Sequence, residues 1–76
     1  MIPIICTDRN GITHNYNPRY VVDAYKTPSE YNKDWCITII FGKDSGLSPA
    51  LQTIIFKDEK ECDEVLNQII YAIQSI

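Results

Sequence analysis

The sequence predicts an α+β domain in which an antiparallel β-meander of four or five strands is followed by one C-terminal amphipathic helix. Three observations predict this class. Short runs rich in β-branched and aromatic residues alternate with turn residues over positions 1–56. An Asn-Gly dipeptide, the strongest short hairpin signal, separates the first two runs. A stretch with apolar residues at helical spacing then ends the chain, and the strands are expected to form either an open meander or a curled small barrel.

The length of the chain predicts a single domain that spans residues 1–76. This is close to the lower size at which a hydrophobic core sustains a fold. Burial and chain entropy nearly cancel at such a length, so the expected net stability is only about a few kcal/mol. Domains of this size often gain support from disulfides, a metal or a partner subunit.

Five strands are expected, at 2–7, 12–16, 20–26, 35–41 and 50–56. The first turn falls at Asn10-Gly11, because both residues accept a positive φ. Pro18 should end the second strand, since proline has no amide hydrogen to donate to a ladder. The polar segments 27–34 and 42–49 are expected to be loops.

The predicted helix begins after Asp58, which can cap it, and Glu61 completes a pattern similar to a capping box. The apolar stripe on one side of this helix consists of Cys62, Val65, Leu66, Ile69, Ile73 and Ile76. The formal net charge is −3, and all the excess negative charge lies at 57–64. Carboxylates are favoured at a helix start by the helix dipole, so this acidity has a structural explanation and does not require mimicry of nucleic acid.

The strands carry apolar residues on both faces, whereas a sheet with one solvated face should alternate apolar and polar residues. In the strand 35–41, Ile39 lies on one face and Ile40 on the other, and Ile55 likewise faces away from Ile54. One helix can cover only one side, so either the sheet curls into a barrel or a second chain covers the other face. The residues expected at such an interface are Trp35, Ile40, Ile55 and Tyr71.

The three cysteines, Cys6, Cys36 and Cys62, are odd in number and widely spaced. Together with His14, the one histidine, they fit the four clustered ligands of a zinc site poorly. We expect reduced thiols that act as small apolar side chains, with no metal and no cofactor. The odd count also argues against a secreted disulfide scaffold.

The N-terminal apolar run has no basic region before it and is too short for a signal peptide. No stretch approaches the roughly 20 apolar residues of a membrane span. A cytoplasmic location without membrane contact is therefore expected.

No group of residues predicts catalysis. Five acidic residues cluster at the helix start, where the dipole explains them: Asp58, Glu59, Glu61, Asp63 and Glu64. His14 lies in a polar strand with no Cys or Ser partner evident in the sequence, which favours a surface or cross-strand histidine over a catalytic base. The segment 42–46 lacks the spacing of a phosphate loop and joins two strands rather than opening a helix.

The first third of the chain carries a recognisable pattern made of Met1-Ile2, Asn10-Gly11, Asn17-Pro18 and Val21. This pattern resembles the small flagellar-operon proteins of the FlbD family, which are similar in plan, with short strands and a closing helix that has an acidic start. Here 54–61 stands in the place of that strand-to-helix junction, while the predicted loops are longer than the family's tight turns. The resemblance implies a small cytosolic accessory protein without catalytic residues, and it carries over no site.

These observations favour a non-enzymatic accessory module, encoded by a phage or mobile element, that binds a protein partner and forms a homodimer. The alternative is a single-stranded nucleic-acid binder, similar to dimers built from a strand meander and one helix, in which aromatic residues stack on bases. Residues 1–56 hold five basic and five acidic side chains, whereas nucleic-acid binders usually show a basic patch. An uncharged apolar patch on the sheet would favour the first reading, and a basic groove the second.

Overall fold

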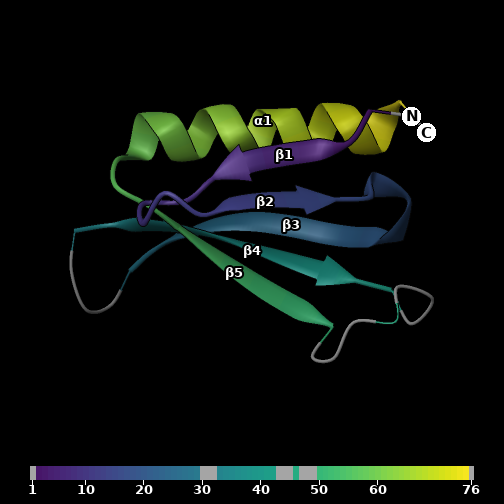
Figure 1. Cartoon of the computed structure of the whole chain (residues 1–76), viewed down its shortest axis with the longest axis horizontal. Coiled ribbons are helices and arrows are strands. Elements are labelled where there is room, and N and C mark those ends of the chain that lie inside the picture. Colours follow the sequence, from purple (N-terminus) through teal and green to yellow (C-terminus); the bar gives the residue numbers. More distant parts are fainter. Residues whose placement is uncertain (1, 30–32, 43–45, 47–49, 76) are drawn as a thin grey trace.

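The chain folds as one helix on a set of antiparallel strands, which confirms the predicted α+β class (Figure 1). The computed structural model describes residues 2–29, 33–42, 46 and 50–75. The elements in chain order are β1 (Ile4–Thr7), β2 (Thr13–Tyr16), the 3-10 turn η1 (Pro18–Tyr20), β3 (Val21–Pro28), β4 (Trp35–Phe41), β5 (Leu51–Phe56) and α1 (Glu59–Gln74). No helix in these ranges is long and apolar enough to cross a membrane.

The strands form two sheets, a β1–β2 hairpin and a three-stranded sheet in the order β3–β4–β5. The meander divides at η1, where the Asn17 side chain accepts a hydrogen bond from the Arg19 N–H at 3.0 Å and Pro18 begins the turn. The turn directs the chain away from β2 before β3 begins. The described strands therefore do not close into a barrel. The hairpin and the sheet meet where the Arg9 N–H donates to the Ile55 carbonyl at 2.9 Å.

Two strand boundaries differ by two residues from those predicted, and the starts of β2, β3 and β5 differ by one. β1 starts at Ile4, after Pro3, because proline cannot donate to the ladder. β3 extends to Pro28, beyond the predicted end at Lys26, because Thr27 pairs with Cys36 in the register. The polar residues at 27–34 predicted a loop from residue 27 onward. Pairing with residues farther along the chain extends the edge strand to Pro28 instead.

A β-bulge at Val22 interrupts the pairing of β3 with β4, with the register shifting between Val21 and Asp23. The Val22 side chain is 68% exposed at the edge of the sheet. Next to it, the Asp23 side chain accepts a hydrogen bond from the Ala24 N–H at 2.8 Å. The bulge thus twists the outer edge of β3 locally, and the Asp23 side chain occupies part of that edge.

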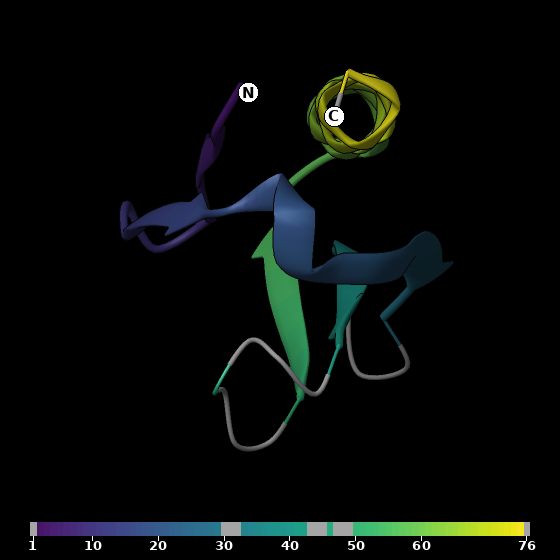
Figure 2. The same ribbon diagram turned by 90° about the vertical axis from the view of Figure 1, so that its right-hand side faces the viewer.

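The helix packs on one face of the three-stranded sheet, with the hairpin beside it (Figure 2). Asp58 is the N-cap, as predicted, and its carboxylate accepts from the Glu61 N–H at 2.8 Å. The buried core consists of Ile4, Cys6, Ile37, Ile39, Phe41, Ile54, Phe56, Cys62, Ile69 and Ala72. Three further members of the predicted stripe, Val65, Leu66 and Ile73, pack against this core, and Ile76 lies outside the described residues.

Candidate functional site

The three-stranded sheet has two faces that differ in what lies on them. The face toward α1, called here the covered face, carries Ile37, Ile39, Ile54 and Phe56, each at most 2% exposed. The opposite face, called the open face, has no other element of the described chain packed on it (Figures 1 and 2). The register places nine residues there: Asp23, Tyr25 and Thr27 from β3, Cys36, Thr38 and Ile40 from β4, and Leu51, Thr53 and Ile55 from β5.

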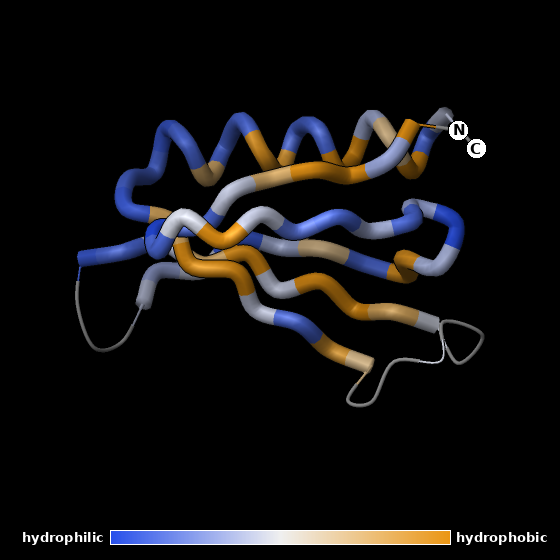
Figure 3. The backbone as a smooth tube through the Cα atoms, viewed as in Figure 1, coloured by the Kyte–Doolittle hydropathy of each residue, from blue (hydrophilic) through white to orange (hydrophobic). Residues whose placement is uncertain are grey.

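The strand register orders these nine residues into three rows that cross the sheet. The first row is Asp23, Ile40 and Leu51, the middle row is Tyr25, Thr38 and Thr53, and the third row is Thr27, Cys36 and Ile55. Three large apolar side chains of the open face are substantially exposed, with Tyr25 at 42%, Leu51 at 45% and Ile55 at 39%. Apolar colouring runs along most of β4, whereas β2 is pale to hydrophilic (Figure 3). The open face is therefore a mixed surface of aliphatic, aromatic and hydroxyl groups.

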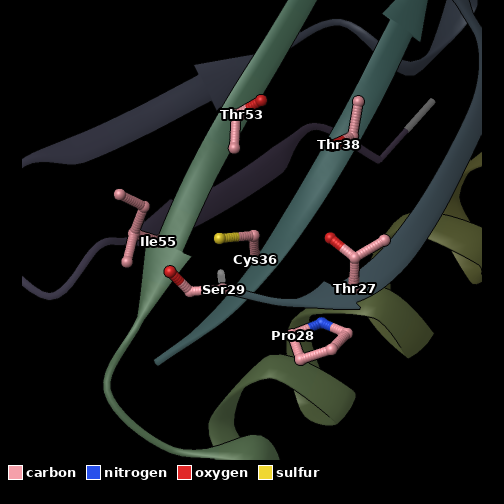
Figure 4. Close-up of a pocket in the computed structure, with 7 residues that line it drawn as sticks. All are labelled: Thr27, Pro28, Ser29, Cys36, Thr38, Thr53 and Ile55. Carbon is pink, nitrogen blue, oxygen red and sulfur yellow. The ribbon is translucent and has the colours of Figure 1, made fainter. Parts of the chain in front are cut away.

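A shallow pocket of about 470 Å³ lies at the third-row end of the open face. Its lining residues are Thr27, Pro28, Ser29, Cys36, Thr38, Thr53 and Ile55. Figure 4 shows the Cys36 thiol between the side chains of β3 and β5. All of the lining side chains are uncharged, so the pocket offers shape, hydroxyl groups and one thiol rather than a charge.

The structure separates the four residues predicted at an interface. Ile40 and Ile55 lie together on the open face. Trp35 lies on the other side of the sheet, half-buried, with the Lys26 ammonium 4.9 Å from its ring centroid. Tyr71 lies on α1 and is 62% exposed.

Sequence reasoning missed the contribution of β3 to the open face. Thr27 was expected in a loop, and Tyr25 had no assigned side of the sheet. The alternation of Tyr25 and Thr27 with Ala24 and Lys26 is the signal that could have revealed this face, because alternate residues of a strand share a side.

Two of the basic side chains that could track a phosphate backbone are held in ion pairs. Lys26 contacts Glu59 at 3.0 Å and Asp63 at 2.6 Å on α1, and the hydrogen bond to Asp63, followed by that to Glu59, raises the pKa of Lys26. Arg9 pairs with Asp34, which is only 7% exposed. Among the nine open-face residues, the one side chain charged at neutral pH is the carboxylate of Asp23.

The hairpin holds a hydrogen-bonded group formed by Asp8, His14 and Tyr16. The Asp8 carboxylate lies 2.9 Å from His14 Nε2, and the Tyr16 hydroxyl lies 3.3 Å from His14 Nδ1. Cys6 is directly across the hairpin from His14. Burial raises the pKa of the Cys6 thiol, which is the reverse of what a nucleophilic cysteine requires. With both imidazole nitrogens engaged, this group stabilises the hairpin rather than activating a thiol.

Three of the five acidic residues at the helix start make structural contacts. Asp58 caps α1, while Glu59 and Asp63 bind Lys26. In the described ranges, no group of three or more His, Cys, Asp or Glu residues could hold a metal ion. The three cysteines carry free thiols, and burial raises the pKa of Cys62 to about 11. The segment 42–46 that was compared with a phosphate loop lies largely outside the described residues.

The fold and its surfaces define a small α+β domain whose most distinctive exposed feature is the open face. Comparison of the chain with models of known families, with curated proteins and with solved structures finds no match. The resemblance to the FlbD family therefore stays a prediction.

Proposed function

We propose that this chain is a non-catalytic protein-binding module that associates with itself through its open face. One observation supports this proposal. The open face is nearly uncharged and exposes Tyr25, Leu51 and Ile55, yet no element of the described chain covers it. Exposed apolar side chains that share one uncovered face of a sheet are typical of interaction sites, and here they lie among threonine hydroxyls. Its removal from water is worth roughly 25 cal/mol per Å².

The distribution of charge favours a second copy as the partner. The excess acidic residues lie at 57–64, around the start of the helix on the far side of the sheet. When two copies meet through their open faces, the two acidic helix starts remain on the outer sides of the pair. They are then separated by more than the Debye length of about 8 Å at physiological ionic strength, so the net charge of −3 on each chain opposes association only weakly.

A protein partner suits this face better than single-stranded nucleic acid. A strand of nucleic acid needs basic side chains along the path of its phosphates. The charge on the open face is that of Asp23, which would repel a phosphate. Interface cores between proteins, by contrast, are depleted of charged residues and enriched in aromatic ones.

The test is the mass of the protein in solution, measured by light scattering across micromolar concentrations. We expect the parent to approach twice its chain mass of 8.7 kDa. Ile55→Lys should return the mass to that of a monomer, because it places a charge within the contact, opposite the partner's Leu51 or Thr27. Ile12→Lys is the matched control, since Ile12 is 58% exposed but lies on the hairpin, and this variant should still form dimers.

A parent that remains at 8.7 kDa as its concentration increases would refute the proposal. Circular dichroism of each variant checks that the fold is kept. If the mass rises only in preparations that contain nucleic acid and falls after nuclease treatment, the nucleic-acid reading replaces this one.

A further inference from the structure

We infer that the partner on the open face is a second copy arranged as a two-fold sandwich, in which the two β4 strands run antiparallel and cross at Thr38. This inference rests on the proposed self-association and specifies its geometry. In this arrangement the first row of each copy lies over the third row of the other. The pattern of charge and bulk over the three rows supports this arrangement.

Two packed sheets related by a two-fold axis can be arranged in two simple ways. Such an interface is self-complementary, so residue i meets residue j of the partner and j meets i. Aligned sheets keep their strands within about 30° of each other. The two-fold axis therefore has two possible directions. If it runs along β4, each row lies over the same row of the partner, and β3 lies over the partner's β5. If it runs across the strands, the first row lies over the partner's third row, and β3 lies over the partner's β3.

The position of Asp23 discriminates between these arrangements. An axis along β4 would press the Asp23 carboxylate against the partner's Leu51, in the same row and on the opposite edge strand. Burying a charge against an aliphatic side chain is costly, and the Asp23 carboxylate would then have only the hydrogen bond that it accepts from the Ala24 N–H at 2.8 Å. An axis across the strands instead places Asp23 over the partner's Thr27, whose hydroxyl can donate a hydrogen bond to it.

The distribution of bulk gives the same answer independently. Ile40 and Leu51 stand side by side in the first row, and the shallow pocket lies at the third row around Cys36. With the axis across the strands, Ile40 meets the partner's Cys36 and enters the hollow, and the same contact forms a second time by symmetry. With the axis along β4, bulk would meet bulk at one end while the two hollows would face each other at the opposite end, with a loss of van der Waals contact.

The size of the surface predicts a dimer that dissociates on dilution. Three strands about 4.8 Å apart and three rows about 6.6 Å apart make a contact patch of about 14 by 20 Å on each copy, well below the roughly 800 Å² per partner of a standard interface. Chemical cross-linking, which captures a dimer in rapid exchange, is therefore the appropriate measurement.

The chain contains its own probe for this geometry. Cys36 lies on the open face, whereas Cys6 and Cys62 are only 6% and 0% exposed and should react slowly. A short bismaleimide is the suitable reagent, because packed sheets lie about 10 Å apart, beyond the Cα separation of about 4.4–6.8 Å that a disulfide spans. Each thiol adds its sulfur and its hydrogen across one maleimide double bond, so no oxidant is required.

The experiment mixes the parent with the double variant Ile40→Cys, Cys36→Ser in equal amounts. We expect the covalent dimer to join Cys36 of the parent to the new sulfur at position 40 of the variant, as identified by mass spectrometry of the linked peptides. Each protein alone should cross-link at least several-fold less, because the matching sulfurs of two copies lie about 13 Å apart along the strands in addition to the distance between the sheets. The single variant Cys36→Ser gives the background from the two buried cysteines.

The outcomes separate this inference from the proposal on which it depends. Efficient self-linkage of the parent through Cys36 overturns the antiparallel arrangement and assigns the axis along β4. A dimer that Ile55→Lys dissociates but that gives no linkage in the mixture overturns the arrangement while self-association stands. A monomer in light scattering overturns both.

Discussion

The two faces of the β3–β4–β5 sheet have similar aliphatic side chains but opposite environments. On the covered face, Ile37 and Ile39 have no exposed surface, whereas on the open face Leu51 is 45% exposed and Ile55 is 39% exposed. The difference comes from the number of available layers, because one α-helix of 16 residues covers one side of a sheet and the described part of the chain forms no second α-helix. Apolar character in a strand therefore does not by itself distinguish core from contact surface. The following predictions test that distinction.

The largest contrast is expected between neighbouring residues of β5. Phe56→Ala should destabilise the monomer by about 3–5 kcal/mol, since it removes a ring that is 0% exposed and leaves a cavity. Ile55→Ala should cost only about 1 kcal/mol, because its side chain is already in contact with water. Urea unfolding followed by circular dichroism, at concentrations below the association range, gives both values. Equal losses would mean that Ile55 belongs to the monomer core.

A smaller loss of stability is expected when the N-cap of α1, the helix on the covered face, is removed. Asp58→Ala should lower the free energy of unfolding by about 1 kcal/mol, because the Glu61 N–H loses its acceptor. The same denaturation measurement checks this, with Lys57→Ala as a control outside the cap. Overlapping unfolding curves for Asp58→Ala and the parent would contradict the capping role.

The segments with strong local signals were predictable from the sequence. β4 and β5 are rich in β-branched and aromatic residues, and α1 combines a capping residue with an apolar stripe, so their boundaries lie within about two residues of those expected. The apolar character of both faces was also visible, as the positions of Ile40 and Ile55 show. These features depend on residues close together in the chain.

The features that were missed depend on partners far along the chain. Lys26 contacts α1 residues more than thirty positions away, and Arg9 reaches Asp34 across 25 positions. The division of the meander at η1 also depends on how the hairpin packs beside the helix, which no local pattern encodes. Trp35, one of the residues predicted at an interface, lies on the covered face of the sheet, opposite Phe56 in the register.

The smallest predicted effect concerns the β1–β2 hairpin, which belongs to neither face of the three-stranded sheet. It tests whether a hydrogen bond within the hairpin contributes to the stability of the fold. The hydrogen bond with His14 lowers the pKa of Asp8 below its ordinary value of 3.8. The ionised carboxylate therefore contributes stability that is present above about pH 3.8 and is lost as the pH falls through the lowered pKa. Urea midpoints measured between neutral and acidic pH should fall less steeply for Asp8→Asn than for the parent. Parallel pH profiles would show that this bond does not stabilise the fold.

The bulge at Val22 has a consequence for how far an assembly of this protein can grow. Sheets with free, flat edges recruit further strands and extend into fibrils. Here the β3 edge is twisted at Val22 and its Ala24 N–H is already bonded to Asp23, while the Arg9 N–H occupies the Ile55 carbonyl on β5. Each flank of the sheet thus has one backbone group that is not available to an added strand. If the proposed self-association through the open face forms, it closes after two copies and gives a finite particle rather than a polymer.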